Sequence, residues 1–220
     1  MDILGHGVYT LPEAARLTRL RPSRVREWFA GSAKVRGVAP VFRGDYPVVD
    51  GDQAISFHDL IELFVAGQLR DRGVSLRNLR KVHENLRNDL GTAHPFCRRE
   101  ILTRDGQVFT LGLDEPGRGE MIDVLRRQRV FPDILLPFLH RIDYDRATEM
   151  ARRWCIADRV VIDPGICLGK PIIEGIGIAT AVLAASYEAN GRDAELVADW
   201  FRVHPTHVLA AVDFERTLAA

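Results

Sequence analysis

Basic side chains that could bind phosphate gather near the amino-terminal end of the sequence. Residues 16–43 hold eight arginine and lysine residues against one acidic residue, Glu27, a local charge of +7 in a chain whose net charge is zero. Residues 158–220 hold five basic and nine acidic side chains, a local charge of −4. This uneven distribution of charge favours nucleic-acid binding by the amino-terminal part of the chain and a different role for the carboxy-terminal part.

A glycine-lysine motif later in the chain resembles a phosphate-binding loop but has the wrong spacing. Gly165 and Gly169 are separated by three residues, and Pro171 follows Lys170. A nucleotide-binding loop of this type has four residues between its glycines and a Ser or Thr after the lysine, which shape the amide cradle and hold Mg²⁺. We therefore do not expect nucleotide binding here.

The histidine and cysteine spacings do not predict a metal or redox site. His204 and His207 are three residues apart, as in some metal sites, but have no third ligand nearby. The cysteines are odd in number and lack C-x-x-C spacing. No triad order or pair of catalytic carboxylates stands out, so we expect no enzyme, no catalytic residues, no metal and no cofactor. The cysteines are Cys97, Cys155 and Cys167.

Two short helices are predicted to carry the amino-terminal arginines. Thr10-Leu-Pro-Glu13 has the form of a capping box, and Leu11, Ala14 and Ala15 fall on one face of the helix that it begins. Pro22 suits the first position of a second helix, which Gly31 ends. The second helix carries an apolar face at helical spacing, formed by Val25, Trp28 and Phe29.

Two helices joined by a tight turn, the second rich in arginine, are typical of a helix-turn-helix. The alternative is a helical hairpin whose arginines are merely solvated. Val38 to Val49 is rich in Val, Pro and Gly and predicts a small hairpin or wing, which favours the DNA-binding interpretation. Arginine suits both guanine edges and phosphates. The expected DNA-binding residues are Arg21, Ser23, Arg24 and Arg26 at the recognition helix, with Lys34, Arg36 and Arg43 near the wing.

Two longer helices and a less regular region follow. Ser56-x-x-Asp59 predicts the start of a helix that Gly73 ends, and Ser75 begins another. Asp105-Gly106 predicts a hairpin turn between strands at 101–111. We expect an extended segment from Phe131 to Ile142 and a short helix from Ala147 to Trp154. Arg126-Arg127-x-Arg129 is interpreted as a solvated helix face.

The last part of the sequence predicts two short strands and three helices. Val160–Ile162 and Ile172–Ile173 are β-branched runs around a Gly/Pro loop. A helix from Ala179 to Ala189 is expected to turn Val182, Leu183 and Tyr187 inward. Asp193 and Pro205 begin two more helices, giving a trihelical helix-turn-helix in form. Its acidic charge favours protein contact over DNA contact.

The predicted fold is therefore mainly α with small β-hairpins, in three parts. Residues 1–90 would form a winged helix-turn-helix, residues 91–157 a middle region that dimerises or displays a partner surface, and residues 158–220 the trihelical domain. No signal peptide or apolar run of transmembrane length is present, so we expect a cytoplasmic protein without membrane contact.

The stretch from Asp158 to Gly175 resembles the entry to a bacterial domain family known as DUF433. That family's pattern runs roughly I-x-D-P-x-x-x-G-K-P-x-I-x-G-T-R-I. The family's Thr-Arg pair is replaced here by Ile176-Gly177. The matching residues are Ile162, Asp163, Pro164, Gly169, Lys170, Pro171, Ile173, Gly175 and Ile178.

The amino-terminal order resembles the MerR-type winged helix-turn-helix. It is more similar still to VapB-type antitoxins that carry a carboxy-terminal DUF433 domain. The residues that carry this likeness are Tyr9-Thr10, Glu13-Ala14-Ala15, Arg26-x-Trp28, Ser56-Phe57-x-x-Leu60-Ile61-Glu62-Leu63 and Gly73-Val74-Ser75-Leu76.

The resemblance implies an antitoxin that represses its own operon and neutralises a PIN-like, VapC-type ribonuclease toxin. Such antitoxins commonly occlude the toxin's acidic Mg²⁺ site or insert an arginine into it. A homodimer is expected, because helix-turn-helix proteins usually pair to match two half-sites. The expected partner-binding residues are Lys170, Glu174, Trp200 and Phe201.

The main alternative is a MerR-like effector-responsive transcriptional regulator without a toxin partner, with residues 91–220 as its ligand-binding domain. Its signature would be a long dimerising helix after the wing and an apolar pocket with convergent polar groups. A toxin-like gene beside this one would discriminate between the two. An enzyme is the third hypothesis, and no catalytic motif favours it.

Overall fold

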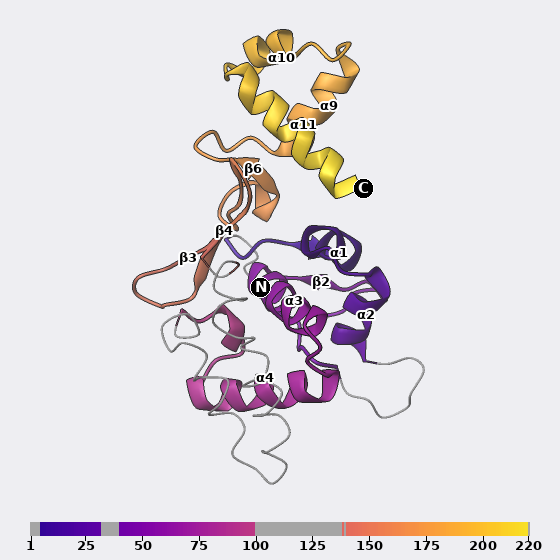
Figure 1. Cartoon of the computed structure of the whole chain (residues 1–220), viewed down its shortest axis with the longest axis vertical. Helices are drawn as coiled ribbons and strands as arrows, with labels where there is room; N and C mark the ends of the chain where they lie inside the picture. The colour runs from indigo at the N-terminus through magenta and orange to yellow at the C-terminus, as the bar shows by residue number, and fades with distance from the viewer. Residues whose placement is uncertain (1–4, 32–39, 100–137, 139, 220) are drawn as a thin grey trace. The chain divides into compact units, whose positions relative to one another are not determined.

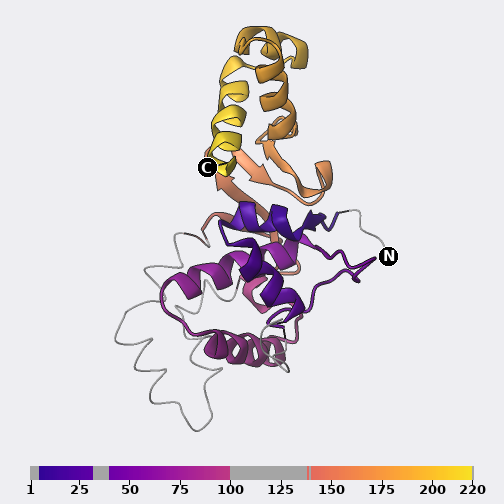
Figure 2. The same ribbon diagram turned by 90° about the vertical axis from the view of Figure 1, so that its right-hand side faces the viewer.

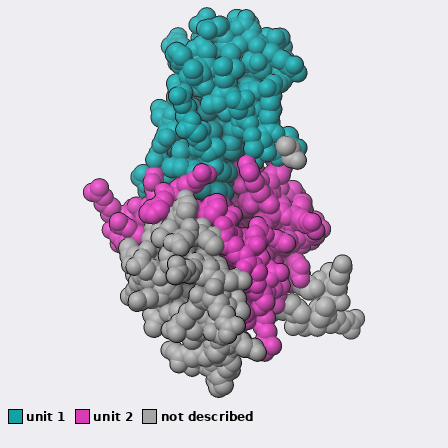
Figure 3. Space-filling model, in the orientation of Figure 1, with its two compact units in different colours: residues 1–9, 152–220 teal, residues 10–151 magenta. Residues whose placement is uncertain are grey.

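The computed structural model describes residues 5–31, 40–99, 138 and 140–219. Seven α-helices and two small antiparallel sheets lie in these ranges, so the fold is mixed α/β and not mainly α as expected (Figure 1). The chain forms two compact units, one of residues 1–9 and 152–220 and the other of residues 10–151 (Figure 3). In the described ranges, none of the helices is long and apolar enough to span a bilayer.

The first two helices of residues 10–151 form where the capping signals predict. α1 (Leu11–Thr18) begins at Thr10, whose hydroxyl accepts a hydrogen bond from the Glu13 amide. α2 (Pro22–Ala30) has proline in its first turn and ends at Gly31, whose amide donates to the Glu27 carbonyl. Both predicted helices are therefore confirmed, to within a residue at each end.

A short stretch of extended chain separates α2 from the next helix. β1 (Tyr9–Thr10) pairs with β2 (Ala54–Ile55) in a two-stranded sheet. Before β2, Val49 and Asp52 bond to each other through both backbone groups around Asp50-Gly51, both of which have positive φ. This is the geometry of a type I′ hairpin turn. The hairpin expected within Val38–Val49 thus turns just beyond that range, and residues 32–39 lie outside the described part.

Two fifteen-residue helices supply the core of this unit. α3 (Phe57–Asp71) starts with a complete capping box, in which Ser56 and Asp59 each bond the other's backbone amide. α4 (Leu76–Leu90) starts at Ser75, whose hydroxyl accepts from the Asn78 amide. A 3-10 turn, η1 (Pro95–Cys97), follows. The predicted hairpin at 101–111, the helical arginines at 126–129 and most of the extended segment at 131–142 lie outside the described residues.

The second sheet is built from β3 (Ile142–Tyr144), β4 (Ala151–Ala157), β5 (Val160–Ile162) and β6 (Pro171–Ile173), in that order. β5 pairs antiparallel with both neighbours, Trp154 opposite Ile162 and Val161 opposite Ile172. The prediction of a helix at Ala147–Trp154 is wrong. Its last four residues belong to β4, because pairing in the sheet, with Trp154 opposite Ile162 of β5, outweighs their weak helical pattern.

The loop between β5 and β6 is tightly turned. Asp163 accepts a hydrogen bond from the Gly165 amide, and the 3-10 turn η2 (Cys167–Gly169) follows with three successive positive φ angles. The Val8 amide donates to the Leu168 carbonyl, and the Tyr9 hydroxyl donates to the Gly169 carbonyl. The amino-terminal residues thereby pack on this loop, within the unit to which both belong.

Three helices complete this unit, as the sequence predicts: α9 (Thr180–Ala189), α10 (Ala194–Phe201) and α11 (Pro205–Ala219) (Figure 2). α11 packs along α9 and α10. Asp193 caps α10 through the Leu196 amide. Leu183 is buried as expected, but Val182 is 46% exposed, so its predicted inward position is wrong. α11 packs along the Leu183 side of α9, and the helix twist then leaves residue 182 facing outward.

Candidate nucleic-acid interface

The inner face of α2 is fixed by packing. Val25, Trp28 and Phe29 are at most 5% exposed. The turn before α2 is closed by Arg19 in the left-handed conformation and by a 2.9 Å hydrogen bond from the Leu20 amide to the Ala15 carbonyl. Because one face of α2 is held in this way, its opposite face is directed outward and is presented rigidly.

That outward face carries most of the DNA-binding residues that the sequence predicts for this helix. Arg21, Ser23 and Arg26 are exposed, and Ser23 and Arg26 share a side because they are three residues apart. Arg24 differs from them. It is half-buried, and its Nη1 lies 3.3 Å from Oδ1 of Asp71 at the end of α3. Arg24 thus braces α2 against α3 as well as contributing charge.

The residues predicted near the wing are partly described. Arg43 is exposed, whereas Lys34 and Arg36 lie outside the described residues. The chain beside Arg43 is anchored firmly, because the amides of Val41 and Phe42 both donate to the Trp28 carbonyl. The Phe42 ring packs against the rings of Trp28, Phe29 and His83, with centroids 5.1 to 6.0 Å apart.

A cluster of polar side chains lies beside this segment, and its members are buried except for Asp45. Asp59, which is 1% exposed, accepts 3.0 Å hydrogen bonds at Oδ2 from the amides of both Ser56 and Asp45. The Ser56 hydroxyl donates to Oδ2 of Asp45 at 2.5 Å. A single carboxylate therefore caps α3 and also ties the loop at residue 45 to the start of that helix.

His94, which follows α4 in the sequence, belongs to the same cluster. Its Nε2 lies 2.9 Å from Oδ1 of Asp45, and its Nδ1 lies 3.9 Å from Oδ1 of Asp59. The ring of His58, whose Nε2 bonds the Ala151 carbonyl, is 5.4 Å from the His94 ring. A protonated imidazolium at His94 would face two carboxylates at once.

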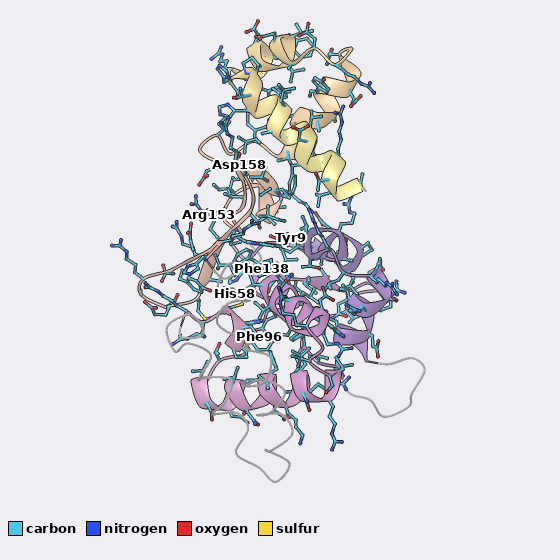
Figure 4. All side chains as sticks on the ribbon, viewed as in Figure 1. Tyr9, His58, Phe96, Phe138, Arg153 and Asp158 are labelled. Carbon is cyan, nitrogen blue, oxygen red and sulfur yellow. The ribbon has the colours of Figure 1, made fainter. Side chains whose placement is uncertain are left out.

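Glu62, one turn further along α3, makes another pair, and both of its members are buried. Its Oε2 lies 2.9 Å from Nε2 of His83 on α4, and its Oε1 accepts a hydrogen bond from the Phe96 amide at 2.8 Å. Figure 4 labels His58 and Phe96, which come from α3 and η1. The two pairs together connect the loop at residue 45, α3, α4 and η1 through polar contacts.

The electrostatics of this cluster favour an ion pair between Asp45 and His94. Burial by itself would raise the pKa of Asp45, but hydrogen bonds from His94 and Ser56 outweigh burial and lower that pKa to about 2. Burial would lower the pKa of His94, but the hydrogen bond to Asp45 and nearby carboxylates raise it. Burial raises the pKa of Asp59 to about 6, against its two backbone hydrogen bonds.

Asp45, Asp59 and His94 could also hold a divalent cation by ligand type, since one atom of each lies within 4.8 Å of the others. The same atoms are, however, already engaged with one another and with Ser56 in a hydrogen-bonded network. We therefore assign this cluster a structural role, which is to tie the loop at residue 45 to the start of α3 and to His94. His204 and His207 make local contacts with each other and with Thr206.

The predicted partner-binding residues lie on two separate elements. Lys170 precedes β6 and is half-buried, and Glu174 follows β6 and pairs with Arg153 at 3.1 Å. Trp200 is 59% exposed near the end of α10, where Phe201 is half-buried. The structure therefore assigns Trp200 to an open surface and Glu174 to an ion pair.

The Asp45–His94 pair is a feature that the sequence did not predict. The capping box at Ser56 and Asp59 was visible, but Asp45 and His94 are 49 residues apart. His94 directly precedes the 3-10 turn η1. No spacing rule links a loop aspartate to a histidine across two helices.

Comparison with known proteins supports the carboxy-terminal assignment. Residues 160–214 match a family described as "Protein of unknown function (DUF433)", so the chain contains a DUF433 domain. The crystal structure of Rv2018 from Mycobacterium tuberculosis is similar in fold, with a TM-score of 0.73, 22% sequence identity and coverage of 93% of this chain and 96% of that one. No curated protein matches the sequence.

Proposed function

From the DUF433 domain and the exposed arginine face of α2, we propose that this protein is an antitoxin that binds operator DNA and neutralises a PIN-like ribonuclease toxin. The observation that carries the DNA-binding half is the orientation of α2. Its apolar side is fixed against α1, while Arg21, Ser23 and Arg26 are directed outward. Two helices with this turn and this charge suit the major groove.

The exposed arginines and Arg24 have different roles in this proposal, because they lie in different surroundings. Arg26, with Ser23 on the same side of the helix, would reach base edges or phosphates in the groove, and Arg21 at the amino-terminal end would contact the backbone. Arg24 would hold α2 in place through Asp71, so DNA phosphate would have to compete with that carboxylate. Arg43 extends the positive surface toward the wing.

The toxin-binding half rests on the resemblance to VapB-type antitoxins with a DUF433 domain, and on charge. The segment from 158 to 220 has a surplus of acidic residues, which disfavours DNA contact and favours a basic protein. In this proposal a homodimer places two α2 helices on adjacent half-sites, and the DUF433 domains bind the toxin.

The DNA-binding half is tested by the shift of a DNA fragment from upstream of the gene. Arg21→Ala/Arg26→Ala should weaken binding at least 30-fold if each contact is worth about 1–3 kcal/mol. The matched control is Arg152→Ala, which removes an exposed arginine from β4. Equal loss in both variants would indicate general charge attraction, and no loss in either would refute the assignment of α2.

The toxin-binding half is tested by co-expression with the product of the neighbouring open reading frame, with only this chain tagged. A complex of defined mass by light scattering, which neutralises ribonuclease activity, is the expected result. If the chain instead elutes alone as a dimer that shifts its own promoter, the toxin hypothesis fails. The MerR-like regulator without a toxin partner then becomes the explanation.

A further inference from the structure

One side of α10 exposes large apolar residues in an otherwise well-packed unit. Leu196 and Trp200 are 39% and 59% exposed and lie four residues apart, on the same side of the helix. Val197, on one flank of this pair, and Ala198, on the opposite side of the helix, are at most 2% exposed. The exposed pair is therefore set by the packing of α10, and an exposed tryptophan on a fixed helix marks an interaction surface.

An acidic row runs beside this apolar row. Glu195 and Asp199 are both exposed and are also four residues apart. Because each residue turns an α-helix by about 100°, they lie roughly 60–100° to one side of Leu196. We call these four residues, Glu195, Leu196, Asp199 and Trp200, the α10 face.

We propose that the α10 face docks onto the RNA-holding surface of the toxin. This inference rests on the proposed function. A ribonuclease must hold the RNA backbone with lysine and arginine side chains and often stacks bases on apolar or aromatic groups. The α10 face offers the complement of both, carboxylates for the cations and an indole for the stacking surface. Occupying that surface would exclude RNA without any contact to the toxin's own acidic centre.

Charge favours a basic partner over a second copy of this chain. In an antiparallel pairing of two α10 helices about a two-fold axis, the same flank of each helix meets its copy. Glu195 and Asp199 would then face the same acidic row, and like charges across an interface are unfavourable. The overall acidic surplus of residues 158–220 adds to that repulsion.

The test measures the affinity of the full-length chain for the product of the neighbouring open reading frame. Trp200→Ala should weaken binding at least 30-fold, as a loss of 2 kcal/mol or more at a buried aromatic anchor predicts. Asp199→Lys should slow association, and its effect should shrink at high salt. Both side chains are exposed, so neither change should alter the folding of the free chain.

Two matched controls change the same unit away from the α10 face. Val182→Ala truncates a side chain on α9 that is 46% exposed, and Asp158→Lys reverses a charge whose side chain is 99% exposed at the turn between β4 and β5, labelled in Figure 4. Both should bind as the wild type does. Equal losses in the controls and in the α10 variants would overturn the assignment of this surface.

The remaining outcomes separate this inference from the proposed function. If the wild type binds and neutralises the toxin but Trp200→Ala binds equally well, the α10 face is not the docking surface and the antitoxin function stands. If the wild type does not bind the product of the neighbouring open reading frame at all, the docking inference and the antitoxin function both fail. If Trp200→Ala turns a dimer into a monomer, a second copy covers the face and the inference is wrong. A 2′-O-methyl RNA oligonucleotide should displace the wild-type chain, and failure to do so would refute the RNA-holding surface as its target.

Discussion

The Tyr9 hydroxyl donates a 2.8 Å hydrogen bond to the carbonyl oxygen of Gly169, 160 residues further along the chain. Tyr9 is fully buried, and Thr10, the cap of α1, follows it directly. The bond ties the amino-terminal residues to the Gly-Lys-Pro loop of the DUF433 domain, within the compact unit to which both belong. Gly169 is one of the residues by which that domain resembles its family.

Tyr9→Phe is expected to destabilise the protein by about 1–2 kcal/mol, because the Gly169 carbonyl loses its buried donor while the ring packing stays. Urea unfolding of the two proteins at neutral pH measures the difference. Indistinguishable midpoints would show that water replaces the hydroxyl at the carbonyl.

Gly169→Ala is expected to cost more, about 2–4 kcal/mol, because φ is +80° and an added Cβ would lie 2.2 Å from the Tyr9 oxygen. Gly165→Ala in the same loop is the control. Its Cβ would come no closer than 3.3 Å to Asp163 Oδ1, so a change within about 1 kcal/mol is expected. Thermal unfolding of both variants decides the point, and similar losses would contradict the specific role of Gly169.

The salt dependence of DNA binding should identify phosphate contacts. If Arg26 neutralises one phosphate, Arg26→Ala lowers the slope of log K against log salt by about 1. The control Arg152→Ala should leave the slope unchanged. A weaker affinity with an unchanged slope would place Arg26 on a base edge instead.

The Asp45–His94 pair should make stability depend on pH in a defined window. The pKa of His94 is raised by folding, so its contribution is fully present below the unfolded value of about 6.5 and is lost as pH rises through the folded pKa. The pKa of Asp45 is lowered to about 2, so its contribution is present above 3.8 and is lost as pH falls toward 2. His94→Gln should therefore cost most between about pH 4 and 6.5.

Folding shifts the pKa of Asp59 in the opposite direction to that of Asp45, so its effect on stability has the opposite dependence on pH. Folding raises its pKa from 3.8 to about 6, so its contribution is present below 3.8 and declines as pH rises to 6. Asp59→Asn keeps an oxygen for the Ser56 and Asp45 amides and should remove that decline. Free energies of unfolding in urea from pH 3.5 to 8, taken as differences from the wild type, measure both effects. A pH-independent difference for both variants would show that the cluster does not titrate in this range.

Much of the local structure could be predicted from the sequence because it depends on near neighbours. The caps at Thr10, Ser56 and Asp193 bond amides three residues away, and each begins a helix as predicted. The strands at Val160–Ile162 and Ile172–Ile173 are confirmed in β5 and β6 for the same reason, since β-branched runs between turn residues favour strands.

The wrong predictions concern residues whose structure depends on packing or pairing partners that are distant in the sequence. Ala147–Trp154 was expected to be helical, but pairing with β5 draws its end into β4. Val182 was expected to be buried, but α11 packs on another side of α9. Helical spacing shows which residues share a face, and only the packing partner shows which face is inward.

The sequence by itself determined where the capped helices begin, the positive amino-terminal segment and the resemblance of the carboxy-terminal domain to its family, because each depends on residue type and short spacing. Only the tertiary structure brought Asp45 to His94 and Tyr9 to Gly169, and only it left Trp200 on the surface while burying Val197. Those relationships depend on how whole elements pack against one another, and packing is a property of three-dimensional neighbours, which local spacing does not encode.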